Sequence, residues 1–367
     1  MTGRLMILPG DGVGPEVVAE AKKALAWFDR RSSLGIAVRE EPFGMAAFRR
    51  DGELLSDRLL ADILASDVVL FGAIGGPEYE ALHASVRRRD SLLRVRQELG
   101  LFANIRPIKA LDALSDISPL KKEVTSGVDL VIVRELAGGI YFGDPHGIET
   151  LADGTARAVN TDVYTTPEIR RIARIAFEMA GMRRNDVTSV DKANVMDVSE
   201  LWRREVTALH AKEFSAVKLR HLYIDNCAMQ VVLNPRQFDV VVTSNMFGDI
   251  LSDCAGAIAG SLGMLPSASF SEPGANGKRK ALYEPIHGSA PDIAGQGIAN
   301  PTGTLLSLAM ALRHSLDRAA DADLLEKAVE SVIASGIRTR DIAGRGIAPV
   351  STGAFGDAVV AALDRLA

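Results

Sequence analysis

The chain carries two aspartates, Asp249 and Asp253, at a spacing that suggests metal binding. They follow the β-branched segment 238–244, which predicts a buried strand leading into a helix. Residues four apart share one helix face, so these carboxylates would repel each other mildly unless a positive group lay between them. Because Mg²⁺ and Mn²⁺ prefer oxygen ligands, we expect a divalent-metal site here. Ile250 and Leu251 should anchor the helix in the apolar core; the alternative is a solvated helix face without a ligand.

A second set of candidates consists of arginines at the ends of apolar segments. Arg96 and Arg106 flank the segment 101–105, and Arg134 ends the predicted strand 131–133. An arginine in such a position can bind a carboxylate through two parallel hydrogen bonds. Any one of them, taken alone, is more simply explained as a structural ion pair.

Three further residues are candidates for acid–base or ligand chemistry. Lys192 closes the predicted strand 188–191, and ligands of α/β proteins usually bind at such strand ends. Tyr141 lies in the glycine-rich loop 138–144, which could hold its hydroxyl group at a reacting carbon, and Asp225 offers a third oxygen ligand. No Gly-x-Ser-x-Gly, Cys/His pair or HExxH motif occurs, so the sequence gives no support for a nucleophilic or zinc hydrolase.

Glycine-rich loops indicate where a cofactor could bind. The loop 8–16 follows a strand and opens a helix, but Pro15 and Glu16 replace the third glycine of a GxGxxG motif, which excludes an ordinary Rossmann site. In the segment 284–295, His287 could contact an adenine and Asp292 a ribose diol, where its charge would repel a 2′-phosphate and favour NAD over NADP. The candidates for cofactor contact are Val13, Glu284, His287, Gly288, Ser289, Ala290, Asp292, Ile293 and Asn300. The alternative is a mobile loop with a surface histidine.

Length and composition are those of a globular enzyme. A chain of 367 residues most naturally forms two domains, and its net charge of −5 argues against a nucleic-acid partner. No apolar run is long enough for a membrane span, and the first eight residues are too short for a signal peptide. Cys227 and Cys254 have no metal-ligand spacing, so we expect a reduced, cytoplasmic protein.

Strand and helix patterns alternate along the chain, which predicts an α/β fold with a largely parallel sheet. Strands are expected at 4–8, 67–72, 128–133 and 187–190, and helices at 15–29, 166–180, 301–318 and 320–335. No Pro/Gly/Ser-rich linker separates two domains, so the chain is expected to cross between them within shared secondary structure.

Long motifs resemble the β-decarboxylating dehydrogenases of the isocitrate/isopropylmalate family nearly from end to end. They are LPGDGVGPEV, LFANIRP, VRELAGGIYFG, SVDKANV, TSNMFGDILSD, GSLGMLPSAS, EPIHGSAPDIAGQGIANPTG and IRTRDIAG. The resemblance implies that family's two-domain fold with a mixed, largely parallel central sheet, which is not a Rossmann fold. It implies a cofactor-binding domain of residues 1–102 plus 258–367, and a substrate, metal and dimerisation domain of residues 103–257.

The family resemblance also implies the roles of the candidate residues. Lys192 matches the base that takes the substrate's hydroxyl proton, and Tyr141 the acid that protonates the enol left after CO₂ departs. The positions that hold the malate carboxylates correspond to Arg96, Arg106 and Arg134. The ligands of Mg²⁺ or Mn²⁺ correspond to Asp225, Asp249 and Asp253, and Asp225 is also expected beside the substrate. The resemblance further implies a homodimer in which Lys192 and Asp225 reach across the interface.

The resemblance is greatest to the isopropylmalate branch of the family. That branch oxidises (2R,3S)-3-isopropylmalate with NAD to 4-methyl-2-oxopentanoate, CO₂ and NADH in leucine synthesis. Leu92, Leu93 and Val195 are candidates to line a pocket for the alkyl group. Asp90 stands where isocitrate enzymes carry a side chain for a third carboxylate, which it would repel.

Other activities remain open at this point. The run 87–89 of arginines replaces the glutamate usual before the leucine pair, and Ser91-Leu92-Leu93 is similar to the tartrate/D-malate enzymes. A D-malate, tartrate or other 3-alkylmalate dehydrogenase is therefore an alternative. A catalytically inactive regulatory subunit would lack a lysine, tyrosine or aspartate of the site, and all are present. A metal-binding module without redox chemistry would show no response to NAD.

Overall fold

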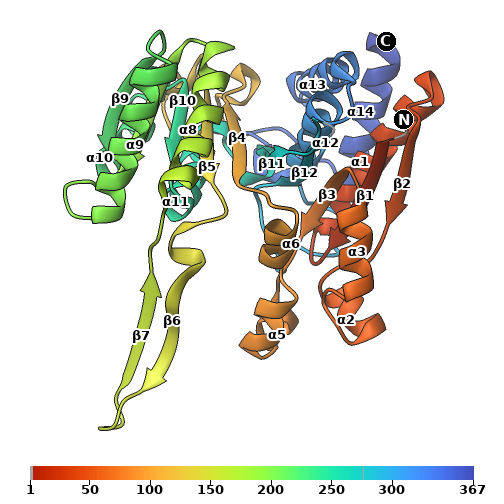
Figure 1. The fold of residues 1–367 in the computed structure, drawn as a ribbon. Helices are drawn as coiled ribbons and strands as arrows, with labels where there is room; N and C mark the ends of the chain where they lie inside the picture. Colours follow the sequence, from red (N-terminus) through yellow and green to blue (C-terminus); the bar gives the residue numbers. More distant parts are fainter. Residues whose placement is uncertain (1–2, 276) are drawn as a thin grey trace. The chain divides into compact units, whose positions relative to one another are not determined.

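The computed structural model describes residues 3–275 and 277–367, apart from the side chain of Arg88 within the arginine run. The chain forms two compact units (Figure 1). Unit 1 comprises Met1–Leu101, Ala110–Lys122 and Gly256–Ala367, and unit 2 comprises Phe102–Lys109 and Glu123–Ala255. The chain therefore passes between the units more than once, and the segment Ala110–Lys122 belongs to unit 1.

Unit 1 contains a mixed sheet with helices packed on it. Its strands lie in the order β2 (Ile36–Glu40), β1 (Gly3–Gly10), β3 (Val68–Ala73), β12 (Arg279–Pro285) and β11 (Pro266–Pro273). All neighbouring pairs in this order are parallel except β12 and β11. Its longest helices, which pack on the sheet or on one another, are α1 (Gly14–Ser32), α12 (Thr302–His314), α13 (Ala319–Ala334) and α14 (Thr352–Leu366).

Shorter helices complete unit 1. They are α2 (Met45–Asp51), α3 (Asp57–Ala65), α4 (Pro77–Glu80), α5 (Ala84–Arg89) and α6 (Leu92–Glu98). The helix α7 (Lys122–Thr125) lies at a boundary between the units. Single 3₁₀ turns occur at η1 (Asp112–Leu114), η4 (Leu262–Met264) and η5 (Arg340–Ile342).

Unit 2 has a mixed sheet of the same kind. Its strands lie in the order β4 (Ala103–Lys109), β5 (Asp129–Glu135), β10 (Val240–Thr243), β8 (Asp186–Asp191) and β9 (Lys218–Tyr223). The pair β4–β5 is antiparallel and the others are parallel. Its longer helices are α8 (Thr166–Gly181), α9 (Asp197–Glu213), α10 (Ile224–Leu233) and α11 (Asn245–Ala259), whose last residues, from Gly256 on, belong to unit 1. The turns η2 (Gly139–Tyr141) and η3 (Pro235–Gln237) are 3₁₀ helices.

The parallel strands of unit 2 bring several candidate functional residues to one edge of its sheet. The carboxyl ends of β5, β10, β8 and β9 meet at the same edge of the sheet, as they must in a parallel arrangement. Arg134 lies at the end of β5 and Lys192 directly follows β8, while Asp225 lies in the first turn of the helix after β9 and Asn245 begins the helix after β10. These candidate residues therefore lie at one edge of the sheet.

A two-stranded hairpin extends from unit 2 (Figure 1). It consists of β6 (Gly143–Thr150) and β7 (Ala156–Thr161), whose side chains are mostly exposed. An isolated two-stranded ribbon is marginally stable in water, so this hairpin has little to hold it within its own unit.

The predicted α/β class with a mixed, largely parallel sheet is confirmed, and the predicted strands and helices are present with ends shifted by a few residues. One packing prediction is wrong. Leu251 is fully buried, but Ile250 is 55% exposed, because consecutive helical residues point about 100° apart. Across the described part of the chain, no helix is long and apolar enough to cross a membrane.

Candidate functional site

The helix α11 presents Asp249 and Asp253 on one face, beside the guanidinium group of Arg106. Arg106 Nη2 lies 3.3 Å from Asp249 Oδ1, and its Nη1 lies 3.8 Å from Asp253 Oδ1. Asn104 holds this arginine in place, since its Oδ1 accepts a hydrogen bond of 2.7 Å from Arg106 Nε. The positive group expected between the two carboxylates is therefore, in this structure, an arginine side chain.

Arg134 reaches the same aspartate from the end of β5. Its side chain is 3% exposed and forms an ion pair with Asp249 through Nη1. The backbone of α11 makes room for it, because a Cβ on Gly248 would lie only 2.7 Å from Arg134 Cγ. The Asp249 carboxylate thus lies between two arginines that were expected to hold substrate carboxylates.

Tyr141 completes this cluster. Its hydroxyl donates a hydrogen bond of 3.1 Å to Asp249 Oδ2, and its ring centroid lies 5.8 Å from Arg134 Cζ. Burial raises the pKa of the Tyr141 hydroxyl, and the neighbouring Asp249 charge raises it further. The hydroxyl therefore keeps its proton at neutral pH, as a proton donor must.

Lys192 and Asp225 form a pair of their own. Lys192 Nζ lies 2.8 Å from Asp225 Oδ1, and this hydrogen bond lowers the pKa of the Asp225 carboxyl. The ring of Tyr223 is 5.9 Å from the same Nζ. Among the residues that the structure describes, no three or more His, Cys, Asp or Glu side chains are arranged to hold a metal ion. Within one chain, Asp225 is thus not grouped with Asp249 and Asp253 as a ligand set.

The carboxylates on α11 nevertheless suit a divalent cation chemically. Asp249 and Asp253 offer oxygen donors from one helix face, and Asp253 is exposed enough to be reached. Burial raises the pKa of the Asp253 carboxyl, while Arg106 opposes this and the Asp249 charge adds to it. A bound cation would relieve that repulsion.

Arg96 lies in unit 1, on α6, where it pairs with Glu284. Arg96 Nη2 donates a hydrogen bond of 2.6 Å to Glu284 Oε1. Its Nε is buried and has no hydrogen-bond partner among the described residues. This buried N–H therefore lacks an acceptor within the described chain, and Glu284, a predicted cofactor contact, is occupied by the arginine.

The three residues expected to line an alkyl pocket differ in exposure. Leu92 is buried, Leu93 is 38% exposed and Val195 is 73% exposed. Leu93 and Val195 are thus accessible to a ligand, whereas Leu92 is largely packed within its unit. Asp90 is also buried, and Arg89 forms two hydrogen bonds with it, of 2.7 and 2.8 Å. This pairing offsets the charge that was expected to repel a third carboxylate.

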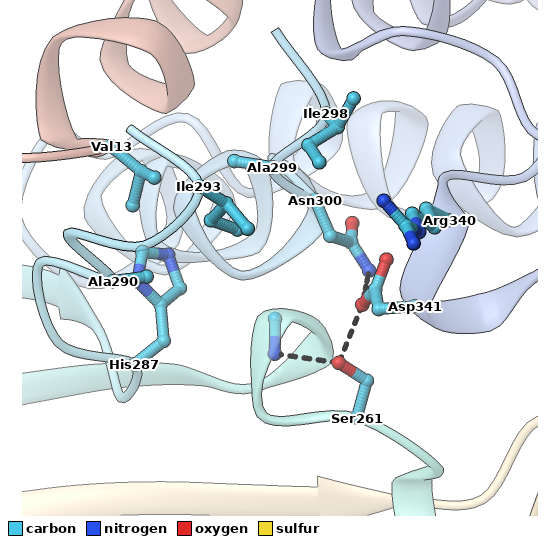
Figure 2. A pocket seen from close by; sticks show the side chains of 11 residues that line it. Val13, Ser261, His287, Ala290, Ile293, Ile298, Ala299, Asn300, Arg340 and Asp341 are labelled. Carbon is cyan, nitrogen blue, oxygen red and sulfur yellow. Dashed lines mark hydrogen bonds between the residues drawn. The ribbon is translucent and has the colours of Figure 1, made fainter. Parts of the chain in front are cut away.

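A pocket of about 490 Å³ lies within unit 1 (Figure 2). Five predicted cofactor residues line it, namely Val13, His287, Ala290, Ile293 and Asn300. The predicted contacts Glu284, Gly288, Ser289 and Asp292 are not among its lining residues. The pocket is mainly apolar, with a few polar groups, as expected of a small-molecule or cofactor site.

Close backbone packing builds one wall of this pocket. The amide of Val13 donates a hydrogen bond of 2.9 Å to the Ser289 carbonyl, joining the N-terminal glycine loop to the segment after β12. At Gly12, whose φ is +59°, an added Cβ would lie 2.0 Å from that same carbonyl oxygen. Gly12 therefore permits this close approach of the two backbone segments.

His287 presents an acceptor that fits a nucleotide base. Its Nδ1 donates a hydrogen bond of 2.8 Å to the Gly288 carbonyl, and its buried Nε2 has no partner among the described residues. Burial lowers the pKa of the imidazole, so the ring is neutral at pH 7 and Nε2 can accept a hydrogen bond. An exocyclic amine of an adenine is a donor of the right kind.

Several lining residues were not predicted. They are Ser261, Gly263, Ile298, Ala299, Arg340 and Asp341. Asp341 Oδ2 accepts hydrogen bonds from Ser261 Oγ at 2.5 Å and from Asn300 Nδ2 at 2.9 Å (Figure 2). The motif IRTRDIAG contained the only signal for Asp341, because these three residues are far apart in the sequence and meet only in the folded unit.

Comparison with known proteins agrees with these observations. The sequence model of isocitrate/isopropylmalate dehydrogenases matches residues 4–359. A 3-isopropylmalate dehydrogenase of Paramagnetospirillum magneticum is 54% identical over 99% of this chain and 98% of its own, and one of Cereibacter sphaeroides is 55% identical over 98% of each. The crystal structure of isocitrate dehydrogenase from Methylococcus capsulatus superimposes with a TM-score of 0.84, at 33% identity and 99% coverage of both chains. The chain belongs to the isocitrate/isopropylmalate dehydrogenase family.

Proposed function

We propose that this protein catalyses the NAD-dependent oxidative decarboxylation of (2R,3S)-3-isopropylmalate to 4-methyl-2-oxopentanoate, CO₂ and NADH, a step of leucine synthesis. The observation that carries the proposal is the cluster in which Arg106, Arg134 and Tyr141 all converge on Asp249. The relatives named 3-isopropylmalate dehydrogenase, at 54% and 55% identity, support the choice of substrate.

In this proposal Arg96, Arg106 and Arg134 bind and orient the malate carboxylates. Lys192 removes the proton of the substrate hydroxyl while the hydride leaves the same carbon. The bond to the second carboxylate then breaks, and the departure of CO₂ leaves an enolate. Tyr141 gives its proton to the carbon that lost CO₂, which converts the enolate to the ketone product.

The proposed reaction also requires a divalent metal ion and a nicotinamide cofactor. When bound, Mg²⁺ or Mn²⁺ held by Asp225, Asp249 and Asp253 would act as a Lewis acid toward the substrate oxygens. NAD, held beside His287 and Asn300, would accept the hydride. The exposed Asp292 would disfavour the 2′-phosphate of NADP.

We propose that the active form is a homodimer in the cytoplasm. Lys192 and Asp225 of one protomer would complete the site of its partner, in keeping with the lack of a three-ligand metal group among the described residues of one chain. The exposed hairpin β6–β7 and the 51% exposed Met229 on α10 offer surface that a second copy would bury. No partner nucleic acid or membrane is part of this proposal.

A D-malate or tartrate dehydrogenase is the alternative within the family. It is favoured by the burial of Leu92, which leaves less apolar surface for an isopropyl group. A substrate panel with NAD and Mg²⁺, followed by NADH absorbance, separates the two. A bound isopropyl group should favour 3-isopropylmalate over D-malate in kcat/KM by roughly 2 kcal/mol, and the opposite preference would support the alternative.

A further inference from the structure

The turn that links β5 to η2 is held by a buried carboxylate. Glu135 is 0% exposed, and its Oε1 and Oε2 accept hydrogen bonds from the amides of Ala137, at 3.0 Å, and Gly138, at 2.8 Å. Arg171 Nη2 lies 3.5 Å from Oε1 and offsets its charge. The backbone of the turn therefore has a fixed course directly after Arg134.

Asn245 connects this turn to the arginine. Its side chain is buried, and Nδ2 donates hydrogen bonds of 3.1 Å to the carbonyls of Leu136 and Gly138. Its Oδ1 accepts hydrogen bonds from Arg134 Nε, at 3.0 Å, and Arg134 Nη2, at 2.8 Å. Although Asn245 is the first residue of α11, these side-chain bonds go to β5 and the turn, so the side chain does more than cap its own helix.

Tyr164 supports both Asn245 and the turn. Its Oη accepts a hydrogen bond of 2.9 Å from the amide of Asn245, and its ring lies beside the turn glycines near the Glu135 carboxylate. The ring fills the space beside the turn glycines, since an added Cβ would lie 2.8 Å from the ring at Gly138 and 2.7 Å from Oη at Gly139. Gly139 also has a φ of +78°, which favours glycine.

We propose that Asn245, Tyr164 and Glu135 are positioning residues that set Arg134 and Tyr141 at fixed places relative to Asp249. Asn245 and Asp249 lie one helical turn apart and bind opposite sides of the Arg134 guanidinium, while Asp249 also accepts the hydrogen bond of Tyr141. Movement of the turn would therefore displace both groups at once. This inference rests on the proposed function, because it takes the roles of Arg134 and Tyr141 from it.

The size of the expected effect follows from the geometry. A displacement of about 1 Å at a reacting group can lower the rate by about 10²-fold. Buried polar networks with all hydrogen bonds made are rigid, and a partly broken network leaves polar groups unsatisfied. Loss of the Asn245 side-chain amide should therefore lower kcat by more than its effect on folding stability would explain.

Two substitutions of Asn245 separate its contacts. Asn245→Ala removes the bonds to Arg134 and to the turn, so kcat should fall about 10²-fold and KM should rise about tenfold. Asn245→Asp keeps an oxygen acceptor for Arg134 but loses the N–H donors to the turn, so KM should return toward the wild-type value while kcat stays low. A residue that served folding alone would not show this split between kcat and KM.

Tyr164→Phe removes one hydroxyl and retains the ring beside the glycines, and it should lower kcat about tenfold. Its matched control is Tyr283→Phe in unit 1, where another buried tyrosine hydroxyl hydrogen-bonds Ser315 Oγ at 2.7 Å. That control should keep both kinetic constants within about twofold of the wild type, while losing comparable thermal stability.

Hydrogen exchange of the segment 136–142 supplies a readout that needs no substrate. Exchange should become faster in Asn245→Ala and Tyr164→Phe and stay unchanged in Tyr283→Phe. Unchanged exchange in the first two variants, or kinetic constants no different from the control, would overturn the positioning role. If the wild type does not turn over 3-isopropylmalate, the proposed function fails, whereas the positioning role is still decided by exchange and by kinetics with whichever malate the enzyme accepts.

Discussion

The cluster around Asp249 in unit 2 and the pocket beside His287 in unit 1 are suited to different ligands. In the cluster, Asp249 lies 3.3 Å from Arg106 and 3.1 Å from Tyr141, and it also pairs with Arg134. The pocket has a neutral imidazole, an amide and small apolar residues beside one ion of each sign, Arg340 and Asp341, and its shape depends on close backbone approach at Gly12. The cluster thus suits a charged oxyacid and a metal, and the pocket suits a largely neutral base.

This difference predicts how each region responds to substitution. When the common partner of several charged groups is removed, all of these groups lose their ion pairs at once, because each is left with an unsatisfied charge. A pocket built from many weak contacts loses affinity by small steps. Substitutions in the cluster should therefore have larger effects than substitutions in the pocket.

The largest effect is expected for Asp249→Asn. It removes the charge that Arg106, Arg134 and Tyr141 share, together with a proposed metal ligand, so kcat/KM should fall by about 10³-fold. Initial rates of NADH formation measure this. The exposed Asp317 provides the matched control, and Asp317→Asn should keep wild-type rates. A loss of less than tenfold in Asp249→Asn would show that the cluster is not the reaction centre.

Tyr141→Phe should have the next largest effect. Without the hydroxyl, the proton donor is lost while the ring still packs near Arg134, so kcat should fall about 10²-fold with little change in KM. Steady-state kinetics at neutral pH measure both constants, and circular dichroism checks the fold. Equal kcat values for the variant and the wild type would assign the proton donation to another group.

A smaller effect is expected for Asp292→Ser, which removes the carboxylate proposed to disfavour a 2′-phosphate. The ratio of kcat/KM for NADP to that for NAD should rise about tenfold, since a like charge on an exposed loop is partly screened. The same assay with each cofactor gives the ratio. Because Asp292 does not line the pocket, an unchanged ratio would show that other residues select the cofactor.

The smallest effect concerns the pH dependence of stability. Burial lowers the pKa of His287 in the folded protein, so the unfolded chain binds a proton more readily, and the stability of the folded state falls as pH drops below the unfolded value of about 6.5. His287→Asn should therefore reduce the fall in Tm between about pH 7 and pH 5. The same fall in Tm in His287→Asn as in the wild type would contradict the buried neutral state.

The sequence predicted the cluster better than the pocket, for a physical reason. Arg134 lies at the end of β5 and Asp249 in the helix that follows β10, and the parallel pairing of these strands brings both to one edge, so pattern alone places them. The network behind them was not predicted. Glu135 and Asn245 belong to quoted motifs, but their hydrogen bonds depend on tertiary contacts that no spacing reveals.

The pocket was predicted only in part because it depends on backbone rather than on charge. Asn300 and Asp341 meet across a long stretch of sequence, and Ser289 contributes a carbonyl instead of its side chain. Asp90 shows the same limit. Its charge suggested that it would repel a ligand carboxylate, but in the structure it is buried and hydrogen-bonded to Arg89. A charge read from sequence has no defined effect until its partner is known.

The most direct measurement follows NADH and CO₂ together during turnover of 3-isopropylmalate by the purified wild type with NAD and Mg²⁺. The proposed reaction predicts that the two products form in equal amounts and that both are lost on addition of a chelator and in Asp249→Asn. NADH without CO₂, or formation of neither product under these conditions, would contradict it.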